Sequence, residues 1–425
     1  KIKRLPKTRK TTKSRRTIKM TLISYKNNVL NVEDVPVPLI ADAVETPFYC
    51  YSTTLLENSF LEFKNEIQKR HPDALICFAV KANANPAVLK TFADLGAGAD
   101  IVSGGELKLA LNAGIPPEKI VFSGVAKTKQ ELTDAVNAGI CQINVESEEE
   151  LTMIDAVARS LSKTADIALR INPDVDAHTH EKISTGKKEN KFGISWESAR
   201  ALYQKAKEMK GVNPAGIDVH IGSQLTETEP FDKAFQKVAD MLKTLIADGI
   251  EIRRVDLGGG LGIPYKDGEN PPSFSQYADV VKKHFPEQNL TLIFEPGRCL
   301  CANAGILVSR VVRMKKTPAK TFLIVDAGMN DLIRPAMYDA YHKAVPVTLN
   351  DSAEIEKYDI VGPVCESSDV FAKERAMQAC RPDELIAFLS AGAYGSTMSS
   401  NYNMHPLAAE VLVKGDQFAV VRKRL

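Results

Sequence analysis

The strongest constraint on the fold is an alternation of short apolar segments with helical segments, which repeats eight times between residues 75 and 295. The apolar segments are rich in β-branched residues, as strands are. Their sequences are LICFAV, ADIV, KIVFS, CQINV, IALRI, GIDVH, RRVDLG and TLIFE. The segments between them, such as GELKLALNAG, place apolar residues three and four positions apart, which is typical of helices. Eight such units predict an α/β fold, a (β/α)8 barrel over residues 47–300.

The chain beyond the predicted barrel has a different pattern. Segments such as GILVSRVVRMKK, IEKYDIVGP and EVLVKGDQFAVVRKRL are β-rich, with few helical stretches between them. They predict a second, mainly antiparallel β domain over residues 301–425. The strand-like segment near residues 21–35 has no barrel partner, so we expect residues 20–46 to join that domain. The 425 residues also exceed what one core usually holds.

The first 20 residues carry ten Lys and Arg and no acid, which leaves the remainder with 45 basic and 53 acidic residues, a net charge of −8. A basic segment can bind nucleic acid or act as a targeting peptide. This one has no apolar region, and a strand pattern follows Met20 at once. We interpret residues 1–19 as a disordered or expression-derived tail, with a targeting role as the alternative, and expect no nucleic-acid partner.

The cysteines and apolar runs bear on location. No apolar run reaches the roughly 18 to 20 residues that a membrane helix needs, so we expect no membrane partner. Seven scattered cysteines are typical of a reducing cytoplasm. Cys299-Leu-Cys301 lacks a second pair of metal ligands, and alternation in a strand explains it better; His178-Thr-His180 lies in a polar, Lys-rich stretch. We therefore predict no metal site.

Polar residues follow many of the predicted barrel strands. In such barrels the chemistry lies at the carboxyl ends of the strands. The residues found there are Lys81 after the first strand, Ser103 to Glu106 after the second, Arg170 and Asn172 after the fifth, His220 and Ser223 after the sixth, Asp256 and Gly258 to Gly260 after the seventh, and Glu295, Pro296, Gly297 and Arg298 after the eighth.

Lys81 would place a charge into or over a packed barrel. That is costly unless burial lowers the pKa of the amine or the amine is neutralised covalently. A Schiff base with pyridoxal 5'-phosphate (PLP) would neutralise it, because such a lysine must be nucleophilic near neutral pH. The alternative is a rim lysine that extends its ammonium group into solvent.

A glycine run, Gly258-Gly259-Gly260-Leu261-Gly262, exposes backbone amides after the seventh strand. Such loops hold phosphate groups. It is not a dinucleotide fingerprint, because the frames that begin at Gly258 and Gly260 meet Ile263 and Tyr265 where glycine is required. With Arg298 and Ser223 at neighbouring strand ends, the run predicts a pocket for one phosphate.

Glu295 and His220 fit the same cofactor. A carboxylate against the pyridine nitrogen keeps that nitrogen protonated, which makes the ring an electron sink. The flat ring of His220 can stack on the cofactor. The alternative for His220 is a hydrogen-bonded core histidine.

These residues together resemble the fold-type III PLP-dependent decarboxylases, a family that includes ornithine, arginine and diaminopimelate decarboxylases. The resemblance covers nearly the whole chain after residue 47, and its motifs occur in the family's order. The motifs are FAVKANANPAVL, GADIVSGGEL, KFGI, HIGSQ, DLGGGLG, FEPGR, VGPVCESSD and AGAYG.

The resemblance implies that Lys81 holds PLP, His220 stacks on the ring and Glu295 pairs with the pyridine nitrogen. It implies that Cys365 lies near the substrate Cα and protonates it after CO2 has left. It also implies an obligate homodimer, in which the CESSD segment reaches into the partner's active site. The residues expected around the cofactor, mostly at its phosphate, are Ser223, Gly259, Gly260, Pro296, Gly297, Arg298 and Tyr394.

The substrate is indicated by the segment RPAMYDAYH at residues 334–342. This segment, with Glu366 and Gln224, resembles the branch that acts on diaminopimelate, whose far end carries an ammonium and a second carboxylate. The resemblance implies that Glu366 binds that ammonium and that Arg298, Arg334, Tyr338 and Tyr394 contribute to substrate binding, chiefly at the distal carboxylate. The alternative for Arg334 is a surface arginine.

The expected reaction is decarboxylation of meso-2,6-diaminopimelate to L-lysine and CO2, the last step of lysine biosynthesis. The nearest alternatives are related decarboxylases of arginine, ornithine or carboxynorspermidine. A racemase resembling alanine racemase has an arginine at the pyridine nitrogen where this chain has Glu295. A catalytically silent regulatory homologue is the alternative of another class.

Overall fold

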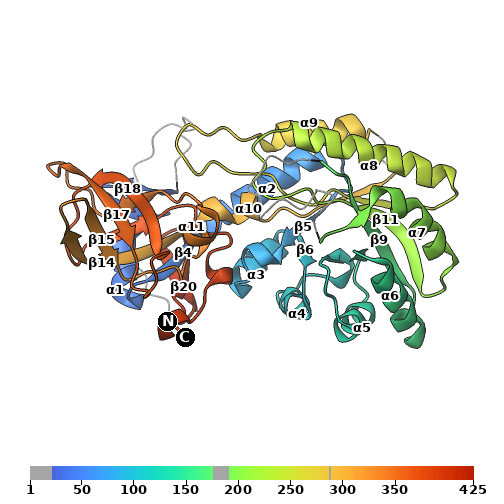
Figure 1. The fold of residues 1–425 in the computed structure, drawn as a ribbon, viewed down its shortest axis with the longest axis horizontal. Coiled ribbons are helices and arrows are strands. Elements are labelled where there is room, and N and C mark those ends of the chain that lie inside the picture. Colours follow the sequence, from blue (N-terminus) through green and yellow to red (C-terminus); the bar gives the residue numbers. More distant parts are fainter. Residues whose placement is uncertain (1–21, 176–190, 287–288) are drawn as a thin grey trace. The chain divides into compact units, whose positions relative to one another are not determined.

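The computed structural model describes residues 22–175, 191–286 and 289–425. These residues group into two compact units, a barrel unit and a β unit (Figure 1). The barrel unit contains residues 59–264 and 268–300, and the β unit contains residues 22–58, 265–267 and 301–425. The basic tail at residues 1–19, His178 and His180 lie outside the described residues.

Eight parallel strands form the wall of the barrel unit, in the positions that the sequence alternation predicts. Neighbours in chain order pair in parallel, the last strand pairs with the first, and β8 pairs with β9, so the sheet closes on itself. The (β/α)8 prediction is confirmed. The strands are β5 (Leu75–Ala79), β6 (Gly98–Ile101), β7 (Ile120–Phe122), β8 (Gln142–Val145), β9 (Ala165–Asn172), β11 (Val212–Asp218), β12 (Arg254–Asp256) and β13 (Thr291–Phe294), with a short β10 (Ile194–Ser195) beside β9.

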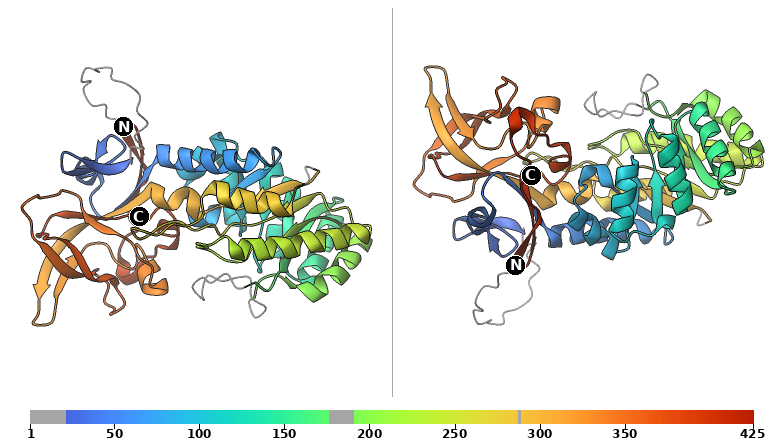
Figure 2. Two further views of the ribbon diagram at one scale, coloured as in Figure 1. Left: turned by 90° about the horizontal axis from the view of Figure 1, so that it is seen from above. Right: turned by 90° about the horizontal axis from the view of Figure 1, so that it is seen from below.

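Helices follow the strands and cover the outside of the barrel (Figures 1 and 2). Side-chain oxygens of Ser103, Thr128 and Ser147 accept backbone N–H groups at the starts of α4, α5 and α6, which fixes where these helices begin. Gly139 ends α5 in the left-handed conformation that glycine adopts without strain. The helices are α2 (Thr53–Gln68), α3 (Pro86–Asp94), α4 (Gly104–Asn112), α5 (Lys129–Ala138), α6 (Glu148–Ser160), α7 (Trp196–Glu208), α8 (Glu229–Ala247) and α9 (Phe274–His284).

The β unit is built on a mainly antiparallel sheet with the order β18-β17-β15-β14-β4-β20-β21. Only the β15–β17 and β4–β20 pairs on this path are parallel. The strands are β4 (Phe48–Ser52), β14 (Gly305–Lys316), β15 (Thr321–Val325), β17 (Ile355–Val361), β18 (Val370–Gln378), β20 (Ala409–Lys414) and β21 (Gln417–Arg422), and β16 (Ala344–Pro346) pairs with β19 (Leu385–Phe388), which pairs with β14.

The N-terminal described residues pack into this β unit. Strands β1 (Ile23–Lys26), β2 (Val29–Val32) and β3 (Val35–Pro36) form a small sheet, and helix α1 (Val37–Val44) follows it. Val32, Val35 and Ile40 share one buried core with Val308 of β14 and Val411 of β20. The assignment of this segment to the second domain therefore agrees with its packing.

Two details differ from the sequence expectation. We expected the barrel domain to begin at residue 47, but β4 pairs with β14 and β20, so residues 47–58 belong to the β unit. A buried run such as FYCYS predicts a strand without naming its partner. Cys299 and Cys301 lie in a short helix, α10 (Arg298–Cys301), and not in a strand. Among the described residues, no helix combines the length and apolarity needed to cross a membrane.

Candidate active site

Lys81 and Asp100 pair at the carboxyl ends of the first two barrel strands. Lys81 lies in a single helical turn directly after β5, and its side chain is 35% exposed. Its ammonium group donates a hydrogen bond to Asp100 in β6, a carboxylate that is fully buried. The lysine charge thus has a buried counter-ion, which sequence analysis did not identify. The only signal for it was an acid inside the apolar strand GADI.

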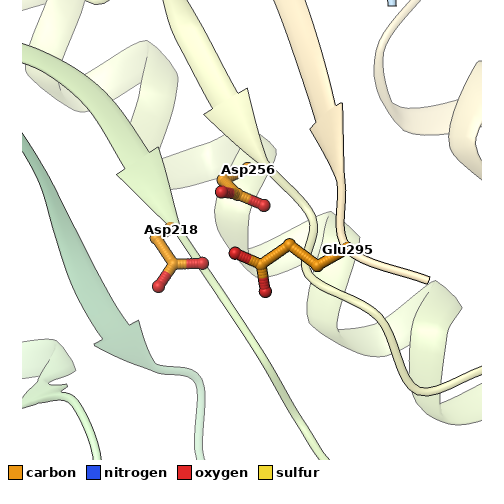
Figure 3. A group of neighbouring side chains, drawn as sticks. All are labelled: Asp218, Asp256 and Glu295. Atoms are coloured by element: carbon orange, nitrogen blue, oxygen red, sulfur yellow. The ribbon is translucent and has the colours of Figure 1, made fainter. Parts of the chain in front are cut away.

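Three more buried carboxyl groups gather where the neighbouring strands end. Asp218 ends β11, Asp256 ends β12 and Glu295 follows β13 (Figure 3). One carboxylate oxygen from each lies within 4.8 Å of the others. Carboxylates this close in a buried site cannot all be ionised.

Burial and mutual repulsion both raise the pKa values of these groups. Burial raises the pKa of Glu295 well above its usual value, and the nearby charges of Asp100 and Asp256 raise it further. The pKa of Asp256 is raised to about 6, first by burial and then by the charge of Asp100. The cluster therefore keeps protons near neutral pH, and a cation beside Glu295 would offset the cost of ionising it.

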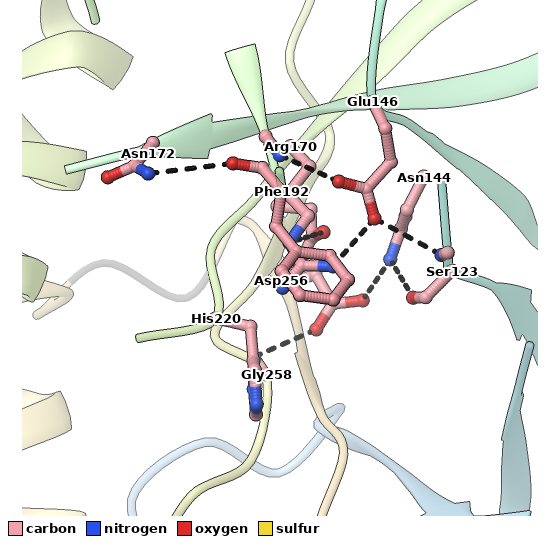
Figure 4. A network of polar contacts seen from close by, with 12 residues as sticks. Ser123, Asn144, Glu146, Arg170, Asn172, Phe192, His220, Asp256 and Gly258 are labelled. Carbon is pink, nitrogen blue, oxygen red and sulfur yellow. Dashed lines mark hydrogen bonds and ion pairs between the residues drawn. The ribbon is translucent and has the colours of Figure 1, made fainter. Parts of the chain in front are cut away.

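Asn144 connects the cluster to the barrel wall. Its side-chain amide, fully buried at the end of β8, lies 3.0 Å from Ser123 Oγ, 3.3 Å from an Asp256 carboxylate oxygen and 3.4 Å from a Glu295 carboxylate oxygen (Figure 4). Gln142 Nε2 donates to its carbonyl oxygen at 2.8 Å, which orients the amide so that its N–H groups face the acids. Sequence analysis missed Asn144, whose only signal was a polar residue in the strand QINV.

Arg170 brings a buried positive charge to the same region. Its guanidinium donates to Glu146 at 2.6 Å and lies 3.9 Å from Asp218 (Figure 4). The guanidinium also lies over the Phe192 ring, 4.9 Å from its centroid. Glu146 accepts the backbone N–H of Gly193 at 2.7 Å, so the carboxylate that pairs with Arg170 also holds the backbone at Gly193.

His220 lies two residues beyond the end of β11, beside the glycine run. The backbone N–H of Gly259 donates to His220 Nδ1 at 3.2 Å, so Nδ1 is an acceptor and the proton of the neutral ring is on Nε2. Burial lowers the pKa of His220 well below its usual value, and the charges of Arg170 and Lys81 add to this. The imidazole ring of His220 is therefore uncharged, and the hydrogen bond from the Gly259 N–H to Nδ1 fixes its orientation.

The glycine run packs too closely for side chains. A Cβ on Gly259 would lie 2.3 Å from the carbonyl oxygen of Glu295, and one on Gly260 would lie 2.6 Å from that of Gly222. Gly260 also has a φ of +109°, which favours glycine. Next to Gly222, Ser223 Oγ accepts a hydrogen bond from Arg298 Nη2 at 2.9 Å. Three strand-end loops thus meet at one point that carries an arginine, a hydroxyl group and glycine backbone.

These groups fit PLP. The barrel supplies an amine at Lys81, a glycine-lined loop beside Arg298 for an anion, and an excess of buried acid that a cationic ring nitrogen would stabilise. Pro296 and Gly297 hold the turn between Glu295 and Arg298, because the Pro296 carbonyl accepts the Ala79 N–H at 3.1 Å and the Gly297 carbonyl accepts the Leu300 N–H at 3.1 Å.

The other expected site residues lie in the β unit. Arg334 and Tyr338 begin and end helix α11 (Arg334–Tyr338), and the side chain of Arg334 is buried, so it is not a surface arginine. Pro335 and Ala336 of α11 line a cavity of about 430 Å³ together with Ser367 and Ser368, and Arg334 and Tyr338 are not part of its lining. Tyr394 follows β19 in the turn AGAYG, with a φ of 54°.

Cys365 and Glu366 lie on an exposed segment of the β unit. Cys365 is exposed, and its backbone N–H donates to Asn403 at 2.8 Å. Glu366 accepts hydrogen bonds from Ser368 and Tyr402, which lower the pKa of its carboxyl group. The buried carboxylate of Asp369 accepts the Val364 N–H at 2.7 Å and holds the base of this segment.

Comparisons with known proteins indicate the same cofactor. Residues 56–302 match the family model for the pyridoxal binding domain of pyridoxal-dependent decarboxylases. A diaminopimelate decarboxylase of Zymomonas mobilis is 49% identical over 95% of this chain and 96% of its own length, and one of Aquifex aeolicus is 46% identical over 95% and 94%.

The chain also resembles solved structures of diaminopimelate decarboxylases. The diaminopimelate decarboxylase of Helicobacter pylori complexed with L-lysine superposes with a TM-score of 0.87 at 43% identity, over 91% of this chain and 96% of that one. That from M. jannaschi gives 0.90 at 38% identity, over 95% of each chain. The fold and the strand-end residues define a pyridoxal-dependent decarboxylase with an alanine-racemase-like barrel. Within that class, the chain belongs to the diaminopimelate decarboxylase family.

Proposed function

We propose that this protein decarboxylates meso-2,6-diaminopimelate to L-lysine and CO2 with PLP as its cofactor. The observation that carries the proposal is the group of Lys81, Glu295 and the Gly258–Gly260 loop at the strand ends of a chain nearly half identical to diaminopimelate decarboxylases. When bound, PLP accepts the electron pair that the departing carboxylate leaves at Cα. This is the carboxy-lyase step that completes lysine biosynthesis.

The barrel unit holds the cofactor in this proposal. Lys81 would be the amine that joins the cofactor's aldehyde, Glu295 would pair with the ring nitrogen, and the neutral ring of His220 would stack on the pyridine. Ser223, Arg298 and the backbone of Gly259 and Gly260 would bind the phosphate, and we assign Tyr394 to the cofactor from its motif AGAYG. The Arg298–Ser223 hydrogen bond supports the phosphate assignment, because it already fixes the guanidinium beside the glycine loop.

Substrate recognition needs one acid and a set of cations or hydroxyl groups. In our proposal Glu366 binds the distal ammonium group. The rest of the substrate, chiefly its distal carboxylate, is bound by Arg298, Arg334, Tyr338 and Tyr394. The exposed thiol of Cys365 delivers the proton to Cα after CO2 has left. The pKa of Glu366 is already lowered by its two hydroxyl partners, so this group is ionised and ready for a cation.

We propose that the active enzyme is a homodimer with shared sites. Cys365, Glu366, Ser367 and Ser368 form a run of exposed residues whose base is held by Asp369, as expected of a segment that enters a partner's site. We also propose a cytoplasmic location, with no nucleic-acid or membrane partner. All seven cysteines lie outside disulfides, which supports a reducing compartment.

Release of CO2 from meso-diaminopimelate, measured with and without PLP, tests the function. Arginine, ornithine and carboxynorspermidine serve as competing substrates. We expect PLP-dependent release from diaminopimelate alone. Faster release from any of the others would assign the protein to a related decarboxylase. A protein that stays colourless with added PLP would be a silent homologue.

A further inference from the structure

Arg334 is held by two aromatic residues of the β unit. Its guanidinium carbon lies 5.0 Å from the centroid of the Tyr265 ring, a cation–π arrangement. Its Nη1 lies 2.8 Å from Nε2 of His342, and both side chains are buried. The rings of His342 and Tyr265 meet edge to face at 5.6 Å. The Arg334 guanidinium is thus held by Tyr265 from a separate loop and by His342 from the segment that follows α11.

The protonation state of His342 follows from its partners. A guanidinium group only donates hydrogen bonds, so Nε2 of His342 must be the acceptor and carries no proton. Nδ1 lies 3.0 Å from the carbonyl oxygen of Leu389, which only accepts, so the single ring proton is on Nδ1. Both contacts are satisfied together by one neutral tautomer, and an imidazolium would lose the first and face a positive charge.

The segment around His342 is anchored on several sides. Arg375 donates to the carbonyl oxygen of His342 at 2.9 Å and lies over the ring of Tyr341, 4.2 Å from its centroid. The carbonyl of Lys343 accepts the Leu389 N–H at 2.9 Å, so the backbone on the other side of His342 is also held. His342 therefore sits in a fixed frame, as a residue that orients another side chain requires.

We infer that neutral His342 is a positioning residue that fixes the Arg334 guanidinium for the distal carboxylate of the substrate, and so sets selectivity for amino acids that carry this group. The inference rests on the proposed function of Arg334. Replacing one hydrogen-bond partner of a buried charge leaves that charge free to turn, which costs affinity for the group it should meet. The effect is confined to ligands with a carboxylate at that end.

Two small ligands separate this effect from general damage. L-lysine, the product, keeps the distal carboxylate and its ammonium group, whereas cadaverine (1,5-diaminopentane) lacks the carboxylate. Inhibition constants for both report on the distal site with the cofactor-loaded enzyme, and direct calorimetric binding reports on it without turnover.

The decisive variants are His342→Gln and His342→Asn. The amide oxygen of Gln can occupy the place of Nε2 and accept from Arg334, whereas that of Asn falls at the level of Nδ1. We expect Asn to raise the KM for diaminopimelate and the inhibition constant of L-lysine about tenfold, with kcat changed less than threefold and cadaverine inhibition unchanged. Gln should restore values within about threefold of the parent enzyme.

His342→Phe and Lys343→Gln complete the series. Phe removes both hydrogen bonds and should match Asn, and in an Arg334→Ala background it should raise KM no further. Lys343→Gln removes only the ion pair with Asp267 at the next position and should leave all constants unchanged. Bound-cofactor absorbance and thermal unfolding confirm that each variant is folded.

Several outcomes would overturn the inference. One is a folded Asn variant with unchanged KM and L-lysine inhibition, and another is an equal loss of L-lysine and cadaverine binding. If the His342→Phe variant does not fold, the comparison of His342→Asn with His342→Gln still tests the inference. A parent enzyme that releases no CO2 from diaminopimelate would refute the proposed function instead, and calorimetry of L-lysine against cadaverine would still test His342.

Discussion

The ammonium group of Lys81 donates a hydrogen bond to the carboxylate of Asp100, which is fully buried in β6. A buried carboxylate without a cation is strongly destabilised, so the pair holds both side chains at the strand ends. The charge of Lys81 also acts on Glu295, where it lowers the pKa that burial raises. In our proposal, the nitrogen that binds the cofactor is thus positioned by Asp100 before the cofactor is bound.

Lys81→Ala should abolish both the absorbance of covalently bound PLP and CO2 release, since no other amine occupies that position in our proposal. Spectra and activity of the purified variant measure this directly. Lys90→Ala is the control, because Lys90 forms an exposed ion pair with Asp94 on α3 and should retain both signals. A Lys81 variant with normal absorbance and turnover would remove this residue from the mechanism.

Asp256→Asn should change how stability depends on pH in the cofactor-free protein. The pKa of Asp256 is raised to about 6 by burial and by Asp100, so between roughly pH 4 and 6 the folded chain holds a proton that the unfolded chain has lost. The stabilisation that this proton gives the folded state is present at low pH and is lost as the pH rises through about 6. The difference in melting temperature, variant minus parent, should therefore increase by a few degrees as the pH is raised from 4 to 7. A difference in melting temperature between variant and parent that stays constant across this pH range would contradict the raised pKa of Asp256.

Ser223→Ala should weaken PLP binding roughly tenfold, because it removes the hydroxyl that accepts from Arg298 at 2.9 Å beside the glycine loop. Titration of the cofactor-free protein by absorbance measures the affinity. Competition by inorganic phosphate should weaken in parallel, which locates the effect at the phosphate. Ser160→Ala is the control, since its hydroxyl donates to Val157 within α6. Equal affinities for parent and Ser223 variant would argue against a phosphate role.

The barrel was predictable because its signal is local. Each strand, such as Leu75–Ala79, is a short apolar run followed by a helical pattern, and closure follows from the number of units. The strand ends also indicated that Arg298 and Ser223 lie close together, and the structure shows a hydrogen bond between them.

The missed features depend on partners that are distant in the sequence. Asp100 and Asn144 are polar residues inside apolar strands, and only the closed barrel shows that one faces Lys81 and the other faces Glu295. His342 meets Arg334 through a turn that residue patterns do not specify. The strand Phe48–Ser52 was expected with the barrel for the same reason, because a buried run does not identify the sheet that it joins.

Cys365→Ala should reduce kcat by roughly a hundredfold while the absorbance of bound PLP persists, because in our proposal the thiol moves a proton and does not hold the cofactor. Cys365 is the one exposed cysteine among the seven, all of which lie in the described residues, so a thiol reagent should label it first and inactivate the enzyme in step. Cys141→Ala, at a half-buried cysteine directly before β8, is the control and should leave turnover unchanged. If the segment enters a partner's site, L-lysine should protect Cys365 from labelling, and the specific activity should fall on dilution. Labelling at full stoichiometry without loss of activity would exclude this thiol as the proton donor.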